Sequence, residues 1–499
     1  MKSKIKYILV LFLALLSFQC CEDKDDFPEK SEVEVINEND SIKIVNVDVQ
    51  DFIWKGLNLY YLWQADVPNL ADDRFANQKE LNQFLSKYPV PEDLFNALRV
   101  NESIDKFSWI EDDYEKLEGQ LQGNTNSNGV EFGLNLKSTG SQEVIGWVRY
   151  IVPNSDASTK NIKRGDIFYA VNGITLTVDN YSELLFGNEN NYKLNFADYS
   201  NGTFVPNGKS VDLTKTPLEE NPILINKVII SGSHKIGYLM YNGFYSNYDS
   251  ELNDAFGALK SQGITDLVLD LRYNGGGSVL TATRLASMIT GSFTGQVFAK
   301  QQWNSKVESY FESNNPDALK NFFTNKIGST PINSVNMSKV YILTTRGSAS
   351  ASELVINGLK PFINVVQIGD VTIGKNVGSI TLYDSPTFDK ENRNPNHRYA
   401  MQPIVLKIVN ALGFGDYQNG LVPNFQQKEA IATNLGVLGS TSEPLLSTAI
   451  AKITGVTARL KPQTAGVEFK SVSNSKSIHE FQNQMYLEKV PEGLSKLLK

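Results

Sequence analysis

Hydrophobic positions divide the chain into regions with different periodicities. From about residue 45 to 121 apolar residues recur at helical spacing, as in Phe52, Ile53 and Leu57, which predicts a helical N-terminal domain. From 222 to 456, apolar strand-like runs such as 267–271 alternate with amphipathic segments that have helical spacing. Strands that alternate with helices in this way predict an α/β core.

The two ends of the chain have different compositions. Lysines at 2, 4 and 6 precede an apolar stretch over 7–16, which is typical of a secretory signal and too short for a membrane span. The only two cysteines, Cys20 and Cys21, are adjacent, so a disulfide framework is excluded. The pair is similar to a lipobox, with Cys21 (or Cys20) as the lipidated residue of a signal peptide over 1–21; a plain cleaved signal is the alternative. The segment 457–499 has weak patterning and no predicted role.

Acidic and polar residues dominate 22–44, which we interpret as a disordered tether because dense charge with few apolar residues cannot form a core. The acidic run behind the cysteines is similar to signals that carry some Gram-negative lipoproteins to the outer surface, and it is equally compatible with a solvated spacer. We therefore expect a cell-envelope, outer-membrane lipoprotein that faces the periplasm or the outer surface. A net charge of −8 argues against nucleic acid as a partner.

A serine cluster carries the strongest chemical signal. The apolar run 340–344 predicts a buried strand that enters Ser348-Ala349-Ser350-Ala351-Ser352, and a helical rhythm follows it and stops before Pro361. Unpaired N–H groups at a helix start favour negative charge, which suits a serine nucleophile, although such serines are also common helix caps.

No histidine is an obvious candidate for the base that would activate this serine. The three histidines of the chain form no recognisable Ser-His pattern. Lys375 lies twenty-five residues after Ser350, and burial can lower the pKa of a lysine to roughly 7–8, where it can act as a base. A second motif, Asp270-Leu271-Arg272-Tyr273-Asn274 followed by three glycines at 275–277, predicts a strand that runs into a turn able to aim N–H groups at an oxyanion.

Together these motifs resemble those of the C-terminal processing peptidases, the tail-specific serine proteases with a Ser-Lys dyad. The resemblance implies Ser350 as nucleophile, Lys375 as base, and N–H groups of Ala351 and Gly276 as the oxyanion site. It also implies the crotonase-like layered core of Clp-type proteases over 222–456. Family members often carry a glutamine four residues after the lysine; Ser379 stands there in this chain and is a possible third residue.

The region 122–221 resembles a PDZ domain, through the segments 148–157, 162–167 and 170–173. In the family a PDZ domain precedes the catalytic core. Phe132, Gly133 and Leu134 fall where its carboxylate-binding loop is expected, and a bound tail would add a strand to the sheet edge. A β-rich spacer that binds nothing is the alternative.

The resemblance thus implies an endopeptidase that captures proteins by exposed C-terminal tails. Two other hypotheses stay open: a catalytically retired, lipid-anchored peptide-binding protein, and a Ser-Lys esterase or amidase. We expect no metal and no cofactor. Oligomeric state, natural substrates, and whether the PDZ-like domain gates activity are left open by the sequence.

Overall fold

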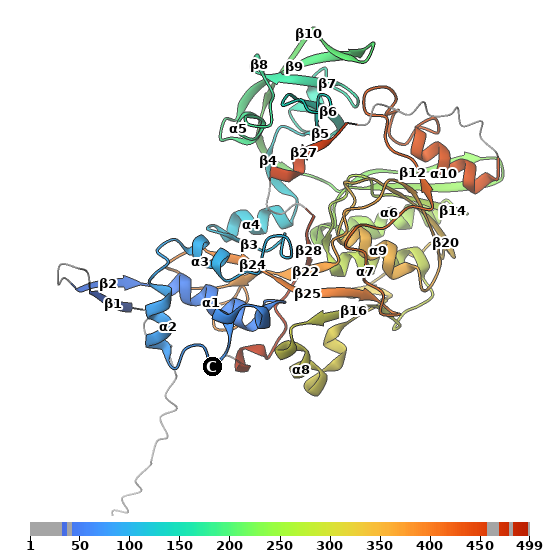
Figure 1. Ribbon diagram of the computed structural model, residues 1–499. Helices are drawn as coiled ribbons and strands as arrows, with labels where there is room; N and C mark the ends of the chain where they lie inside the picture. Colours follow the sequence, from blue (N-terminus) through green and yellow to red (C-terminus); the bar gives the residue numbers. More distant parts are fainter. Residues whose placement is uncertain (1–31, 37–41, 457–468, 479–482, 498–499) are drawn as a thin grey trace, which may run out of the picture.

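The structure is a computed structural model that describes residues 32–36, 42–456, 469–478 and 483–497 (Figure 1). The predicted signal peptide, both cysteines and the acidic run behind them lie outside the described residues. Within the predicted tether, strands β1 (Glu32–Ile36) and β2 (Ile42–Asn46) pair antiparallel, with Glu32 opposite Asn46. The tether is therefore not disordered throughout, because a hairpin satisfies its own backbone groups. No helix in the described ranges is long and apolar enough to cross a membrane.

The N-terminal region is helical and packs into the same hydrophobic core as the region 222–456. Phe52, Ile53 and Leu57 of the first helix are buried in a cluster that also contains Met401 and Leu406. The region is thus one layer of a larger body. Its elements are α1 (Asp48–Tyr60), α2 (Gln78–Leu85), α3 (Pro91–Ala97), β3 (Trp109–Glu111) and α4 (Tyr114–Leu121).

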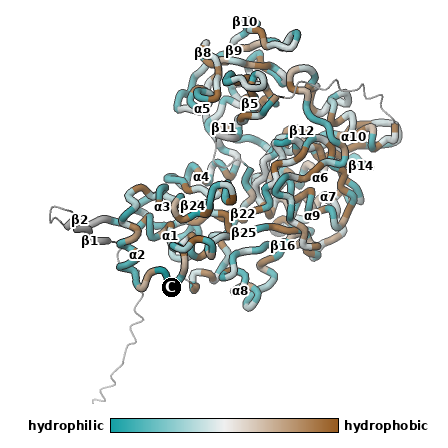
Figure 2. The backbone as a smooth tube through the Cα atoms, in the orientation of Figure 1, coloured by the Kyte–Doolittle hydropathy of each residue, from teal (hydrophilic) through white to brown (hydrophobic). Residues whose placement is uncertain are grey.

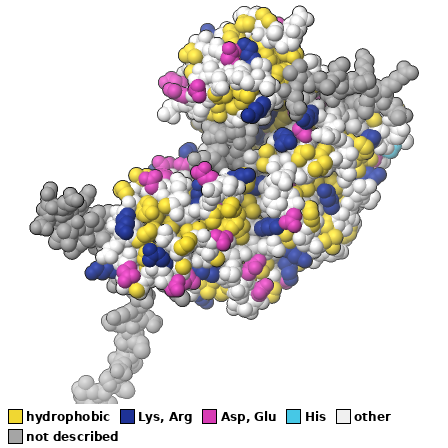
Figure 3. Space-filling model, viewed as in Figure 1, with side chains coloured by type: hydrophobic (Ala, Val, Ile, Leu, Met, Phe, Trp, Pro, Cys, Tyr) yellow, Lys and Arg dark blue, Asp and Glu magenta, His cyan; other side chains and the backbone are white. Residues whose placement is uncertain are grey.

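A small β domain forms a separate lobe at the top of Figure 1, and Figure 3 shows the same lobe as a distinct mass. It has its own hydrophobic core, which includes Phe132, Phe168 and Phe196. Its sheet has the order β10-β9-β7-β6-β5-β27, so the last strand comes from the C-terminal segment. The elements of this region are β4 (Asn124–Ser127), β5 (Val130–Leu136), β6 (Val144–Ile151), β7 (Ile167–Val171), β8 (Ile174–Thr175), α5 (Tyr181–Phe186), β9 (Asn191–Ser200), β10 (Thr203–Thr214), β11 (Thr216–Glu219) and β27 (Ser471–Asn474).

The region 222–456 is built on a mostly parallel sheet with helices on both faces. Leu267 and Leu269 point into the core shared with helices α6, α7 and α9, whereas Val268 belongs to the cluster that contains Leu445 of α10. Because both faces are covered, the strands are continuous apolar runs (Figure 2). The chain thus has a mixed α/β fold. The sheet order is β12-β13-β14-β20-β21-β26, from β12 (Ile223–Ser231), β13 (His234–Tyr241), β14 (Asp266–Asp270), β20 (Lys339–Thr344), β21 (Asn364–Gly369) and β26 (Phe425–Gln426), with α6 (Asp249–Ser261), α7 (Val279–Thr290), α9 (Ala351–Leu359) and α10 (Pro444–Thr454).

A second sheet contains a strand from the C-terminal segment, for which the sequence predicted no role. Strand β28 (Met485–Leu487) pairs in parallel with β15 (Gly277–Ser278) on one side and with β22 (Val377–Ile380) on the other. Strand β28 thereby connects β15, which begins at the last glycine of the turn, with β22, which follows Lys375 in the sequence. The sheet continues through β25 (Ile404–Asn410), β16 (Val297–Trp303) and β17 (Lys320–Phe322).

The remaining elements lie around these sheets. They are α8 (Ser305–Asn314), β18 (Lys326–Ile327), β19 (Thr330–Pro331), β23 (Leu382–Tyr383) and β24 (Ala400–Gln402).

Candidate active site

The predicted catalytic residues follow the carboxyl ends of three neighbouring parallel strands. The glycine turn follows β14, Ser350 follows β20, and Lys375 follows β21. Parallel strands present their carboxyl ends at one edge of a sheet, which is where open α/β sheets place their sites. The topology therefore brings together three segments that are far apart in the sequence.

Ser350 is held in an unusual backbone conformation directly before α9. Its φ is 64° and its ψ is −115°, a region that non-glycine residues rarely adopt and that costs conformational energy. The side chain is buried, and its Oγ has no hydrogen-bond partner among the described residues. A strained, buried hydroxyl without a partner is available for attack on a ligand.

Glu353 connects Ser350 to the segment that carries Lys375. Its carboxylate accepts N–H bonds from Ser350 (2.7 Å), Gly374 (2.7 Å) and Lys375 (2.9 Å). Burial raises the pKa of Glu353 to about 7, while the hydrogen bonds from Thr372 and these N–H groups act in the opposite direction. Sequence reasoning missed this residue, although a glutamate three positions after a helix-capping serine is a known signal.

Lys375 is fully buried, and its surroundings favour the neutral amine. Its Nζ lies 4.4 Å from the centre of the Phe107 ring and donates to Oε1 of Gln484 at 3.2 Å. Burial lowers the pKa of Lys375 to about 7, against the opposing effect of Asp105 and Glu353. A substantial fraction of the lysine is therefore unprotonated at neutral pH, as a general base requires.

The glycine turn lies directly against Ser350. Gly276 has a φ of 111°, and a Cβ on it would lie 2.6 Å from the Cβ of Ser350 and 3.0 Å from the backbone nitrogen of Ala351. Only glycine permits this approach. The N–H of Gly276 donates to Oδ1 of Asn274 at 2.8 Å, so that bond must be given up before the N–H can serve an oxyanion.

The serines on either side of Ser350 are used for structure. Ser348 donates to the carbonyl of Leu271 at 2.8 Å, and Ser352 donates to the carbonyl of Asn274 at 2.9 Å. Both bonds connect the segment around Ser350 to residues 271–274, which lead into the glycine turn.

Arg272 supports the same turn through buried ion pairs. It is fully buried and bonds to Asp270 (2.9 Å from Nε to Oδ1), to Glu443 (2.7 Å) and to Glu429 (3.2 Å). Three carboxylates around one guanidinium compensate its burial. The pKa of Glu429 is lowered to about 2 because Arg164 and Arg272 outweigh the opposing effect of burial.

Ser379 occupies the position of the predicted third residue, but it does not bond to the lysine amine. Its Oγ donates to the carbonyl of Met485 at 3.3 Å and accepts from Gln402 at 3.1 Å. The acceptor for Lys375 is Gln484, from the segment just before β28. Nothing in the local sequence indicated this residue, because the contact spans 109 positions.

The predicted peptide-binding residues form a strand and not a loop. Phe132, Gly133 and Leu134 lie in β5, and β27 of the C-terminal segment pairs antiparallel with it, Asn474 opposite Gly133. The N–H of Phe132 donates to Oγ of Ser475 at 2.9 Å. The sheet edge expected to receive a substrate tail is therefore covered by the protein's own chain.

The site thus belongs to an α/β protein in which a buried serine, a buried lysine with a lowered pKa and a glycine turn lie at one sheet edge. The family model described as peptidase family S41 matches residues 235–383, and the model for the peptidase S41 N-terminal domain matches 48–109. These two matches, together with the relatives below, support the C-terminal processing peptidase family for this chain.

Individual relatives are distant in sequence. A chloroplastic C-terminal processing peptidase of Tetradesmus obliquus is 26% identical over 45% of this chain and 46% of its own length. A probable CtpA-like serine protease of Staphylococcus aureus (strain bovine RF122 / ET3-1) is 29% identical over 33% of this chain and 30% of its own. The chain thus spans less than half the length of these two curated relatives. A crystal structure of a putative S41 protease from Bacteroides fragilis is 26% identical, covers 81% of this chain and 97% of its own, and has a TM-score of 0.62.

Proposed function

We propose that this protein is a serine endopeptidase of the C-terminal processing type that uses Ser350 and Lys375 as a catalytic dyad. One observation carries the proposal. A buried serine hydroxyl without a partner and a buried lysine with a pKa of about 7 follow neighbouring strands, and a single carboxylate fixes both backbones.

The reaction follows from these positions. Oγ of Ser350 attacks the scissile carbonyl carbon while the neutral amine of Lys375 takes the hydroxyl proton. The N–H of Ala351 and the N–H of Gly276, released from Asn274, would hold the oxyanion. The ammonium of Lys375 then protonates the leaving amine, and the lysine afterwards deprotonates the water that hydrolyses the acyl-enzyme.

Gln484 takes the orienting role that the resemblance assigned to position 379. A neutral amide oxygen holds the amine in place and favours its charged form much less than a carboxylate would, and a carboxylate there would raise the lysine pKa. Ser379 supports this arrangement indirectly, because its hydroxyl bonds to the carbonyl of Met485, the next residue.

Substrate recognition is a further part of the proposal. The small β domain, which we take to be of PDZ type, would help to capture proteins with exposed C-terminal tails. Because β27 covers the edge of β5, a bound tail must displace β27 or use another surface. We also propose that the catalytic sheets form a crotonase-like core and that Cys21 (or Cys20) anchors the protein to the outer membrane.

The test is cleavage of an unfolded protein with an apolar C-terminal tail, followed by mass spectrometry. Wild type is compared with Ser350→Ala and Lys375→Ala, and we expect both variants to lose cleavage. Cleavage that persists in Ser350→Ala would refute the mechanism. Tail binding without cleavage by the wild type would favour the retired binding protein, and turnover of small esters alone would favour an esterase.

A further inference from the structure

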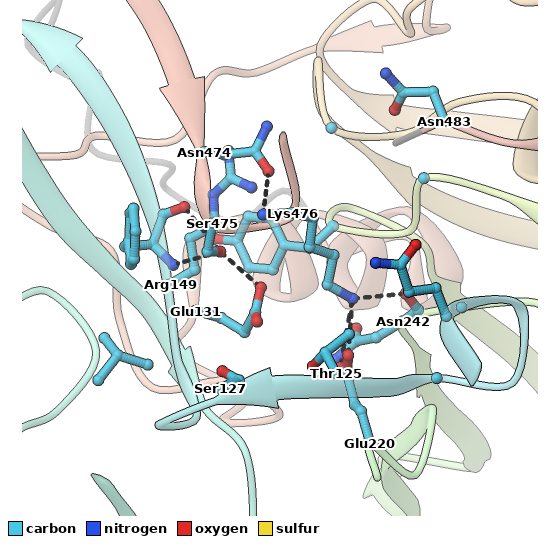
Figure 4. Close-up of a pocket in the computed structure, with 18 of the residues that line it drawn as sticks. Thr125, Ser127, Glu131, Arg149, Glu220, Asn242, Asn474, Ser475, Lys476 and Asn483 are labelled. Carbon is cyan, nitrogen blue, oxygen red and sulfur yellow. Dashed lines mark hydrogen bonds and ion pairs between the residues drawn. The ribbon is translucent and has the colours of Figure 1, made fainter. Parts of the chain in front are cut away.

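A cavity of about 140 Å³ lies where the small β domain, the C-terminal segment and the glycine turn meet (Figure 4). Phe132 of β5 and Phe186 at the end of α5 line one part of it, and the glycines 275–277 line another. Lys476 and Gln484 of the C-terminal segment also contribute to its wall. The cavity therefore leads from the small β domain to the turn that touches Ser350.

Asn242 lines this cavity and comes directly after β13, at the same sheet edge as the catalytic residues. Its backbone is fixed: the N–H donates to the carbonyl of Pro222 at 2.8 Å, and the carbonyl accepts from Nζ of Lys476 at 3.2 Å. Its side chain is different. The residue is only 2% exposed, yet neither Oδ1 nor Nδ2 has a hydrogen-bond partner in the part of the chain that the structure describes.

Two charged groups near Asn242 are matched within the protein. Lys476 forms an ion pair with Glu220 at 3.0 Å, and Ser475 donates to Glu131 at 2.7 Å (Figure 4). Arg149 also lines the cavity, and its Nε has no hydrogen-bond partner among the described residues. What the cavity presents unmatched at Asn242 is one amide donor beside one amide acceptor, which is the complement of a peptide group.

We propose that Asn242 binds a main-chain peptide group of the substrate and that the cavity beside it receives a substrate side chain. This subsite rests on the proposed peptidase function. A buried amide without partners is destabilising in the free protein, and the ligand would supply the missing bonds. A peptide bound here would continue past the glycine turn to Ser350.

The proposal makes two linked expectations for Asn242→Leu, which keeps the shape and removes both polar atoms. The variant should unfold at an equal or higher temperature, because an unsatisfied buried amide is gone. It should bind peptide about five- to fiftyfold more weakly, because two hydrogen bonds to the ligand are lost. A merely structural asparagine would show the opposite behaviour for stability.

Binding is measured in the Ser350→Ala protein, so that cleavage does not interfere, with a labelled unstructured 20-residue peptide that ends in an apolar tail. The matched control is Asn253→Leu. Asn253 is also buried, but its side chain donates to the carbonyl of Pro331 (3.1 Å) and accepts from the N–H of Asn333 (2.7 Å). This control should lower the unfolding temperature and leave peptide affinity unchanged.

Several outcomes would overturn the subsite. They are unchanged peptide affinity in Asn242→Leu, a loss of stability as large as that of Asn253→Leu, or no peptide binding by the Ser350→Ala protein itself. Failure of the proposed function would be seen separately, as absence of cleavage by the wild-type protein. If the wild type cleaves peptide and Asn242→Leu has an unchanged KM, the proposed peptidase function is supported and the proposed subsite is refuted.

Discussion

Two buried cations at the same sheet edge have opposite environments. Arg272, after β14, is surrounded by Asp270, Glu429 and Glu443, and its pKa is raised by these carboxylates although burial acts against them. Lys375, after β21, has a neutral amide and an aromatic face beside its amine, and its pKa is lowered to about 7. Both side chains are buried, so the neighbouring groups determine whether the pKa rises or falls.

The two side chains differ in what their charge can do: the charge of Arg272 supports the structure, whereas Lys375 can lose its charge. A compensated guanidinium stays charged and holds the glycine turn in place. An amine that meets no compensating carboxylate at hydrogen-bond distance can lose its proton and act as a base. Burial of an uncompensated amine costs stability, which leads to predictions that differ in sign for Lys375 and Arg272.

The largest effects are expected for removal of the two cations. Lys375→Met should reduce cleavage by about 10²–10⁴-fold, since the general base is lost, and should stabilise the fold by about 1–3 kcal/mol at pH 7. Arg272→Met should destabilise the fold by about 3–5 kcal/mol, because it leaves buried carboxylates unpaired. Denaturant unfolding and peptide cleavage check both. A loss of stability in Lys375→Met would contradict the conclusion that the buried lysine destabilises the fold.

The sign for Lys375 follows from linkage. Its pKa in the folded state, about 7, lies below its ordinary value of 10.5, so the unfolded chain binds more protons between these two pH values. Stability therefore rises with pH across this window, and the destabilisation is complete below about pH 7. The stabilisation by Lys375→Met should shrink as the pH is raised from 7 towards 10.

A smaller effect is expected when Gln484 is given a charge. The kcat/KM of the wild type should rise with pH up to about 7, as Lys375 loses its proton. Gln484→Glu should move this limb upward by roughly 1–3 pH units, because a carboxylate favours the ammonium. The pKa of Glu353 lies in the same range, so the pH limb of the wild type does not by itself identify the titrating group. The shift of that limb in Gln484→Glu assigns it to Lys375.

The matched control is Gln402→Glu, a buried glutamine that bonds to Ser379 and Thr381. It should leave the position of the limb unchanged. An equal shift in both variants would mean that Gln484 has no special coupling to the lysine.

The acid stability of the Arg272 cluster provides a third measurement. The pKa of Glu429 is about 2 in the folded state, below its ordinary value of 4.5. The stabilisation is therefore present above about pH 4.5 and is lost as the pH falls towards 2, by up to about 3 kcal/mol. Glu429→Gln should be less stable at pH 6 and less sensitive to acid. Urea unfolding at pH 6, 4 and 3 tests this, and a wild-type-like slope in the variant would exclude Glu429 as the cause.

The smallest effect is expected for Ser379→Ala. Because its hydroxyl bonds to Met485 and Gln402 and not to the lysine amine, kcat should fall by no more than about threefold. Steady-state kinetics beside Gln484→Leu, which we expect to lose about tenfold or more, gives the contrast. A larger loss in Ser379→Ala would return the orienting role to position 379.

Short-range patterns predicted much of this protein. The apolar runs 267–271 and 340–344 became the buried strands β14 and β20, and the helical spacing of Phe52, Ile53 and Leu57 became the buried face of α1. Periodicity and turn residues act over a few positions, so the sequence alone was sufficient there.

Contacts between distant segments were decided only by the tertiary structure. The pairing of β27 with β5, the insertion of β28 between β15 and β22, and the bond from Lys375 to Gln484 join positions about 100 to 340 apart. Sequence patterning carries no signal for such pairs, because their geometry depends on how the sheets are ordered. The sequence by itself determined the main buried strands and the first helix, the candidate serine and its lysine. The fold determined the neighbours of that lysine, and these neighbours set its pKa.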